Sequence, residues 1–176
     1  MKKITLTYGL IAGAIVAAPM LLIANYVTNS DGAIDFHNSM LIGYASMLLA
    51  FSMVFVGIRN YRNNYNNGVI GFGKAFTIGG IIVLIASTIY VGTWLIDYFY
   101  FVPDFAEVYA KATIADLKAN GATQAEIDLQ IQEMASFAEM YKNPFYNAMI
   151  TYMEILPVGL VVTLISSLIL KKKATN

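Results

Sequence analysis

The chain has 176 residues, of which 58% are hydrophobic and 12% are charged, and its formal net charge at pH 7 is zero. A soluble domain usually carries about 25% charged residues, so this composition excludes an ordinary soluble domain. The chain has no cysteine and one histidine, which excludes disulfides, thiol chemistry and nearly every zinc-site spacing. We therefore expect an all-α integral membrane protein with no metal and no cofactor.

Four apolar stretches are long enough to cross a bilayer. A hydrocarbon core of about 30 Å needs roughly 20 mainly apolar helical residues. The stretches cover about residues 4–27, 40–58, 75–101 and 145–170. The first resembles a signal peptide, but Pro19 follows its only plausible cleavage site, and proline there normally blocks processing. We therefore predict four retained transmembrane helices in a single membrane domain covering residues 1–176.

Basic and acidic residues separate along the chain. Eight of the eleven basic residues lie in three segments that contain no acid: Lys2, Lys3, Arg59, Arg62, Lys74, Lys171, Lys172 and Lys173. The acids lie in the other loops or toward their ends of the spans. Since basic segments that flank membrane spans stay in the cytoplasm, we predict that both termini are cytoplasmic.

The segment 103–143, between spans three and four, is predicted to be an amphipathic helical hairpin outside the cytoplasm. Apolar residues recur there at helical spacing in two stretches, at Phe105, Val108, Tyr109, Ala112 and Ala115, and at Ile127, Ile131, Met134, Ala138 and Tyr141. Gly121 is placed to end the first helix, and Thr123 and Glu126 form a capping box for the second. The favoured role of the apolar stripes is to pack against each other and on the ends of the spans, and the alternative is to bind a partner protein. Attraction of this segment to anionic lipid is disfavoured, because it contains seven acidic residues and only three lysines.

Small residues recur four apart in the spans, where they allow helix backbones to approach closely. The positions are Gly9, Gly13 and Ala17 in span one, Ala75 and Gly79 in span three, and Gly159, Thr163 and Ser167 in span four. This pattern favours contacts within a four-helix bundle over a homo-oligomer interface, although both are open.

Basic and aromatic residues at the ends of the spans are predicted to be interfacial anchors, because such side chains suit the headgroup region. They are Arg59, Tyr61, Arg62, Tyr65 and Trp94. We expect membrane lipids to be their partners.

One run of residues carries a family resemblance. It extends from Phe51 to Gly68 and continues through Gly71-Phe72-Gly73-Lys74-Ala75-Phe76, together with the Tyr141-Lys142-Asn143-Pro144 joint. In these residues the chain resembles a family of bacterial membrane proteins catalogued as domain of unknown function 4199, over almost its whole length. The resemblance implies a bacterial inner membrane location, and it brings no activity and no catalytic residues.

Asp97 and Glu154 are the two acids that fall inside the spans. Because Asp97 lies nearer the interface, we expect a minor role for it. Glu154 lies deeper, with no Lys or Arg at its depth, so it must accept hydrogen bonds, face water or be protonated. The donors in reach are Tyr90, Thr93, Trp94 and Tyr152. A structural role for Glu154 is weighed against a functional one.

Catalytic and nucleic-acid-binding patterns are missing from the sequence. No His-Glu-x-x-His, Gly-x-Ser-x-Gly or aspartate pair occurs in the spans, and no folded basic face is indicated. His37, with Asp31 and Asp35 nearby, is more typical of a solvated loop than of a metal site. We predict a non-enzymatic accessory or scaffold protein that acts through its acidic hairpin, possible partners being other envelope proteins. The alternative is a small oligomeric transporter or channel that uses Glu154 and Asp97.

Overall fold

The computed structural model describes residues 1–29 and 36–173, with side chains described outside residues 22–40. The described chain is helical: α1 (Lys2–Asn29), α2 (Phe36–Tyr65), α3 (Phe72–Ile96), the π-helical turn η1 (Asp97–Phe101), α4 (Phe105–Ala119), α5 (Gln124–Tyr141) and α6 (Pro144–Leu170). Within this part of the chain, the one β-type pairing is an isolated bridge between Ile70 and Lys172.

Four of the helical segments are long and apolar enough to cross a membrane. They cover Lys2–Leu21, Leu41–Tyr65, Phe72–Phe101 and Pro144–Leu170 among the described residues. A continuous helix satisfies its own backbone hydrogen bonds, which is why apolar sequences of this length adopt it in lipid. The prediction of four apolar helices is therefore confirmed, and it indicates a multi-pass membrane protein.

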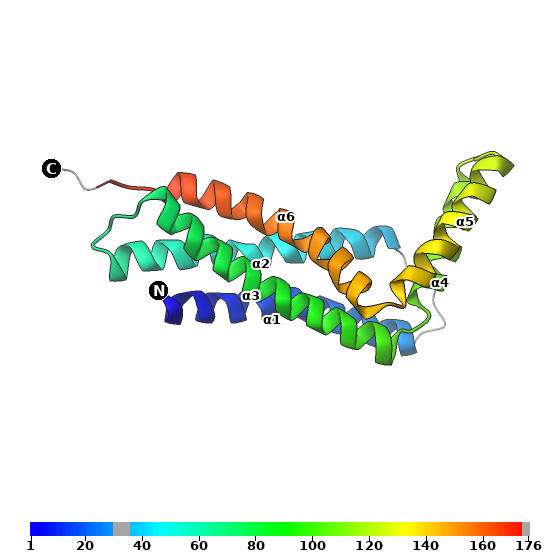
Figure 1. The fold of residues 1–176 in the computed structure, drawn as a ribbon, viewed down its shortest axis with the longest axis horizontal. Helices are drawn as coiled ribbons and strands as arrows, with labels where there is room; N and C mark the ends of the chain where they lie inside the picture. The colour runs from blue at the N-terminus through cyan, green and yellow to red at the C-terminus, as the bar shows by residue number, and fades with distance from the viewer. Residues whose placement is uncertain (30–35, 174–176) are drawn as a thin grey trace.

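The four long helices form one elongated bundle (Figure 1). Helix α1 packs on α2 and α3, and α6 packs on the same two helices. Phe51 of α2 is fully buried near the middle of this bundle, together with Ile82 of α3 and Ile155 of α6. The apolar core therefore joins side chains from helices that are distant in sequence.

Small residues permit the close contacts between these helices. A Cβ built at Gly9 would lie 2.8 Å from Ile85 of α3, and one built at Gly79 would lie 2.7 Å from Cγ2 of Thr163. A Cβ built at Gly13 would lie closer still to Ile89, and one built at Gly159 closer still to Val83, while Ala17 is buried. Each of these residues thus lies at a contact inside the bundle of a single chain.

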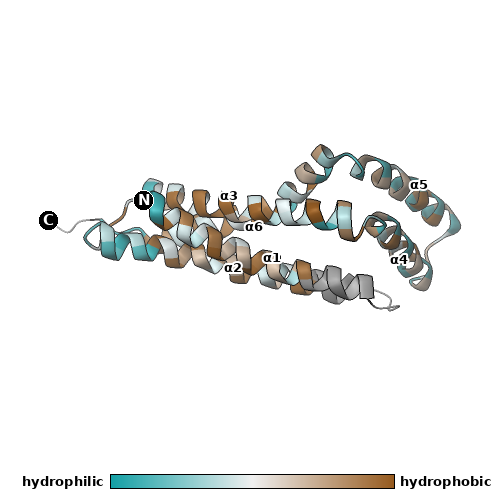
Figure 2. Cartoon of the chain, turned by 90° about the horizontal axis from the view of Figure 1, so that it is seen from below, coloured by the Kyte–Doolittle hydropathy of each residue, from teal (hydrophilic) through white to brown (hydrophobic). Residues whose placement is uncertain are grey.

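Helices α4 and α5 pack against each other and project from one end of the bundle (Figure 1). The capping box at the start of α5 is confirmed, because the Thr123 side chain accepts from the Glu126 N–H and the Glu126 side chain accepts from the Thr123 N–H. Gly121 has φ +77° in the turn after α4, a conformation that glycine adopts without strain. The hairpin is more hydrophilic than the bundle (Figure 2). Three expected stripe residues differ, since Val108, Ala115 and Ile131 are exposed.

The opposite end of the bundle holds both chain termini (Figure 1) and is termed the basic end. There Arg62 Nη1 donates to the carbonyl oxygen of Leu170 at 3.2 Å. The backbone groups of Ile70 and Lys172 exchange two hydrogen bonds, of 3.0 and 2.8 Å. The α2–α3 loop is therefore joined to the chain segment that follows α6.

Candidate functional site

An aromatic cluster connects the hairpin to the bundle. This aromatic joint comprises Trp94, Tyr98, Phe105, Phe137 and Tyr141. Tyr141 is buried, its ring lies 4.7 Å from that of Phe137 and 5.2 Å from that of Tyr98, and Trp94 packs edge-on against Phe105 at 4.9 Å. Burial raises the pKa of Tyr141 above its ordinary value, although the hydrogen bond from Trp94 acts in the opposite direction. Tyr141 is therefore a neutral hydroxyl that holds α5 against α3.

Asp97 lies beside this joint, at the point where α3 passes into the π-helical turn. Its side chain is 2% exposed, and its Oδ2 has no hydrogen-bond partner in the described part of the chain. The Val102 N–H donates to the Asp97 carbonyl oxygen at 2.9 Å, which is the five-residue bond of a π-helix. We expected a minor interfacial carboxyl at this position, whereas the structure places it inside the protein.

Asn147 is a second buried polar residue near the joint. It is fully buried at the start of α6, and its Nδ2 donates to the carbonyl oxygen of Tyr141 at 3.4 Å. Thr151 Oγ1 in turn donates to the carbonyl oxygen of Asn147 at 2.8 Å. The Oδ1 of Asn147 has no partner among the described residues. Two oxygens near the aromatic joint, Asp97 Oδ2 and Asn147 Oδ1, therefore accept no hydrogen bond in the described structure.

Buried polar atoms without partners continue along the interior of the bundle. We use the term polar seam for the five such side chains in the described residues, which lie on α3, on the first residue of η1 and on α6: Ser87, Asp97, Asn147, Thr163 and Ser167. Buried polar groups are normally hydrogen-bonded, so five unpartnered groups on α3, η1 and α6 need a specific explanation. Thr163 lies against Gly79, so helix packing closes the seam at that level.

Glu154 does not belong to the polar seam. It is exposed on the outer side of α6, between the exposed apolar residues Met153 and Pro157. Two expected donors bond elsewhere: Trp94 Nε1 donates to the Tyr141 hydroxyl at 3.0 Å, and the Tyr152 hydroxyl donates to Thr88 Oγ1 at 3.0 Å. The two acids of the spans therefore occupy different environments, Asp97 inside the bundle and Glu154 on its surface.

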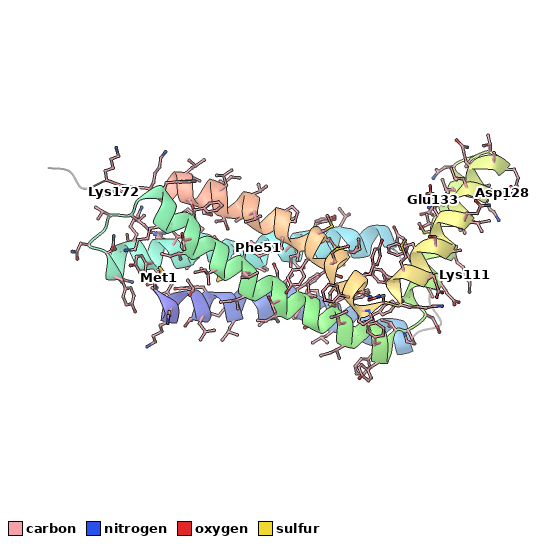
Figure 3. The ribbon with its side chains drawn as sticks, viewed as in Figure 1. Met1, Phe51, Lys111, Asp128, Glu133 and Lys172 are labelled. Atoms are coloured by element: carbon pink, nitrogen blue, oxygen red, sulfur yellow. The ribbon has the colours of Figure 1, made fainter. Side chains whose placement is uncertain are left out.

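The hairpin surface carries most of the acids. Lys111, Asp128 and Glu133 lie on it, far from Lys172 at the basic end (Figure 3). Lys142 and Glu139 form the one ion pair among the described residues, with Nζ and Oε2 2.8 Å apart. Acids are thus in excess at the hairpin, and basic residues are in excess at the basic end.

The predicted interfacial anchors have different surroundings. Arg59 and Tyr65 are exposed, and Tyr61 is buried with Tyr65 stacked on one side. The Lys74 ammonium lies 5.1 Å from the centre of the Tyr61 ring. Arg62 bonds to the end of α6, as described above, so only part of this group is free to meet headgroups. At the other end of the bundle, Trp94 is half-buried in the joint.

Metal binding has no structural support in the described residues, which contain no group of three or more potential ligands. His37, Asp31 and Asp35 lie outside the residues whose side chains are described.

Sequence reasoning missed Asn147 and the burial of Asp97. It placed Tyr141 on the apolar stripe of the hairpin, where the residue is indeed buried, but it did not predict the contacts of Tyr141 with Trp94 and Asn147. Asn147 could have been singled out from the sequence, because an amide side chain, like an acid, is unusual inside a 27-residue apolar helix. The rotation of each helix had no such signal, because hydropathy is high on both faces of a membrane-spanning helix.

Comparison with known proteins gives a family and no relative of assigned activity. The chain has no significant match among curated proteins or among solved structures. Residues 7–172 match the model of a family described as "Protein of unknown function (DUF4199)". Because this match covers nearly the whole chain, the protein belongs to the DUF4199 family.

Proposed function

We propose that the protein is a non-enzymatic accessory or scaffold protein of the bacterial inner membrane, whose α4–α5 hairpin binds another envelope protein. The observation that carries this proposal is the hairpin itself. It extends beyond the bundle (Figure 1), and it is attached through the link to α6 and through the ring contacts of the aromatic joint. A hairpin of this kind exposes a surface on both of its sides, and few of its side chains belong to the core of the bundle.

The charge of the hairpin favours a basic partner. Residues 103–143 contain seven acids and three lysines, and only Glu139 is ion-paired in the described structure. Carboxylates without cationic neighbours complement a positively charged surface and increase the rate of association. Leu129, Ile131 and Met140 are exposed nearby and can supply apolar contact.

The orientation of the charges supports an extracytoplasmic hairpin. The basic end carries Lys172 and the other flanking lysines and arginines, which favour the cytoplasmic side. The hairpin lies at the other end of membrane-length helices, so the proposed partner is on the periplasmic side.

Site-specific photo-crosslinking in native membranes tests the scaffold function. A photoreactive residue at Leu129 should capture one protein with a basic contact surface. The crosslink should be lost in the double variant Asp128→Asn, Glu133→Gln, and the control Lys111→Gln should retain it. A crosslink that persists in the acidic double variant, or none at any exposed hairpin position, would contradict the proposal.

A second candidate, a small oligomeric transporter or channel, is favoured by the polar seam. Its unpartnered oxygens occur near both ends of the bundle, at Asp97 and at Ser167. Water or an ion could be bound by these atoms if α3 and α6 separate. In this proposal Asp97 is the acid that lines the path, whereas Glu154 lies outside it and would act at the interface between subunits.

Ion flux into liposomes tests this candidate. Purified protein should conduct, and Asp97→Asn should abolish the flux while the control Glu133→Gln on the hairpin leaves it intact. If liposomes containing wild-type protein are as tight as empty ones, the transport function is wrong.

A further inference from the structure

Four aromatic side chains are exposed where the third and fourth spans meet the hairpin. We term them the aromatic collar: Phe99, Tyr100 and Phe101 in η1, and Phe145 in the first turn of α6. Phe145 is 85% exposed and Tyr100 is 78% exposed, whereas Tyr98 is buried in the aromatic joint. The collar therefore faces away from the protein core, and its surroundings lie outside the chain.

The collar residues lie at one level of the bundle. Two contacts define how α6 runs antiparallel along α3: Gly79 with Thr163, and Val83 with Gly159. Continued to the end of α3, this register places Asp97 opposite Phe145. The three aromatic residues of η1 follow Asp97 within four positions. All four rings therefore occur at a similar height along the bundle.

The distance from the basic end relates this level to a membrane. Phe101 follows Lys74 by 27 residues, and Phe145 precedes Lys171 by 26 residues. At 1.5 Å per residue both stretches are about 40 Å long, which matches a bilayer of about 40 to 45 Å including its headgroups. With the flanking lysines in one headgroup layer, the collar lies in the other.

The exposed residues change in character along the chain through the collar. Ile96, just before it, is aliphatic and 56% exposed, which suits a position among acyl chains. Asp104 and Glu107, just beyond it, are charged and exposed, which requires water. Between them, Tyr100 combines an apolar ring with a hydroxyl, and tyrosine is enriched at membrane–water interfaces. The collar therefore lies at the boundary between acyl chains and water.

The distribution of the rings favours lipid over a protein partner. Phe99, Tyr100 and Phe101 are consecutive and all exposed, and consecutive helical residues point roughly 100° apart. They cover much of the circumference of η1, and Phe145 adds a ring on a second helix. A protein partner would contact one side of the molecule, whereas a fluid headgroup layer surrounds it.

We propose that the aromatic collar inserts into the lipid headgroup layer at the hairpin end and holds the base of the hairpin at that level. Trp94, which the sequence indicates as an anchor, bonds to Tyr141 inside the joint, and the collar takes its place. Phe99 packs edge-on against Tyr98 at 5.1 Å, so the level of the collar also sets that of the joint. This inference does not depend on the scaffold function, because it concerns lipid contact and not the partner of the hairpin.

Spin labels measure the depth of the collar. The chain has no cysteine, so a single-cysteine variant carries one label. Tyr100→Cys and Phe145→Cys are labelled in the full chain and reconstituted into phosphatidylcholine vesicles. Leu84→Cys in the third span and Leu129→Cys on the hairpin are the controls, since both leucines are exposed. Accessibility to oxygen, which enters hydrocarbon, and to a water-soluble nickel chelate should place both collar labels between the two controls.

Three outcomes of this measurement would overturn the proposal. Collar labels as accessible to nickel as the label at Leu129 would lie in water, and labels as deep as that at Leu84 would lie in hydrocarbon. Shielding of the collar labels from both reagents would identify a second protein or a second copy of the chain as the occupant.

A second experiment tests whether the rings hold this level. In the double variant Tyr100→Ser, Phe145→Ser, a label at Ile96→Cys should move toward water by about 1.5 Å or more, because the apolar stretch is shorter. The control double variant Leu129→Ser, Ile131→Ser removes apolar side chains from the hairpin and should leave the depth of the label unchanged. The same depth in both double variants would show that the collar does not position the hairpin. Circular dichroism verifies that each variant is folded.

Discussion

The indole Nε1 of Trp94 donates a 3.0 Å hydrogen bond to the hydroxyl of Tyr141, which joins the third apolar helix to the last turn of α5. This bond couples an element of the bundle to the hairpin that we propose as a docking surface. Tyr141 also supplies the carbonyl oxygen to which Asn147 donates, so one residue contacts α3 and α6 at once. The orientation of the hairpin should therefore depend on Tyr141.

Tyr141→Ala should free the hairpin without unfolding the bundle. The substitution removes a buried ring and leaves a cavity, at a typical cost of about 3 to 5 kcal/mol that falls on the contacts of the joint. Hydrogen exchange of α5 amides should become faster, while exchange in α2 stays unchanged. Tyr100→Ala is a matched control, because Tyr100 is 78% exposed. Equal exchange in the two variants would mean that the joint does not hold the hairpin.

Thr123→Ala should weaken the start of α5. Loss of an N-cap threonine typically costs about 1 kcal/mol of helix stability. Hydrogen bonds from the Thr123 backbone and side chain lower the pKa of the Glu126 carboxyl, so the ionised form stabilises the cap. This contribution is present above the ordinary glutamate pKa and is lost as the pH falls through the lowered value. NMR titration of Glu126 should show its pKa rising toward the ordinary value in Thr123→Ala; no change would refute the capping role.

Gly79→Ala should destabilise the bundle, and Gly80→Ala should not. A Cβ at Gly79 meets Thr163 and Val54 at 2.7 and 2.9 Å, whereas one at Gly80 meets nothing within 4 Å. Inserting a methyl group into such packing costs about 1 to 3 kcal/mol. Denaturant titration in detergent measures the difference between the neighbouring variants. Similar midpoints would show that α3 and α6 separate easily, which would support an opening of the polar seam.

Reporter fusions test the proposed orientation. A fusion at Gly121, in the exposed turn of the hairpin, should be active only as a periplasmic reporter, because the hairpin lies opposite the basic end. A fusion near Asn66, in the loop between α2 and α3, should be active only as a cytoplasmic one. Cytoplasmic activity at Gly121 would exclude the proposed topology.

Much of the fold could be predicted because its signals are local. Hydropathy locates the four long helices, and the capping box at Thr123 depends on residues three apart. Asn143 as the N-cap of α6 was missed, although its Oδ1 accepts from Phe145 N at 2.9 Å. The candidate site was less predictable. Whether Asp97 or Glu154 faces inward depends on the rotation of each helix about its axis. Because lipid and protein interior are both apolar, hydropathy does not distinguish the lipid-facing side of a helix from its inward-facing side.

Asp97→Asn should stabilise the protein at neutral pH while any function of the polar seam is lost. Asp97 is 2% exposed and its Oδ2 has no partner in the described structure, so its carboxylate would be desolvated without full compensation. An unsatisfied buried polar group costs about 1 to 3 kcal/mol, and an amide of the same shape carries no charge to desolvate. Functional sites commonly retain such unfavourable groups, which is why stabilising substitutions there reduce activity. The measurement is the thermal unfolding midpoint in detergent at pH 7, with Glu154→Gln as a control, since Glu154 is exposed and its substitution should shift the midpoint little. A lower midpoint for Asp97→Asn would show that a positive charge or donor compensates the carboxylate, and Asp97 would then be a structural residue of the joint.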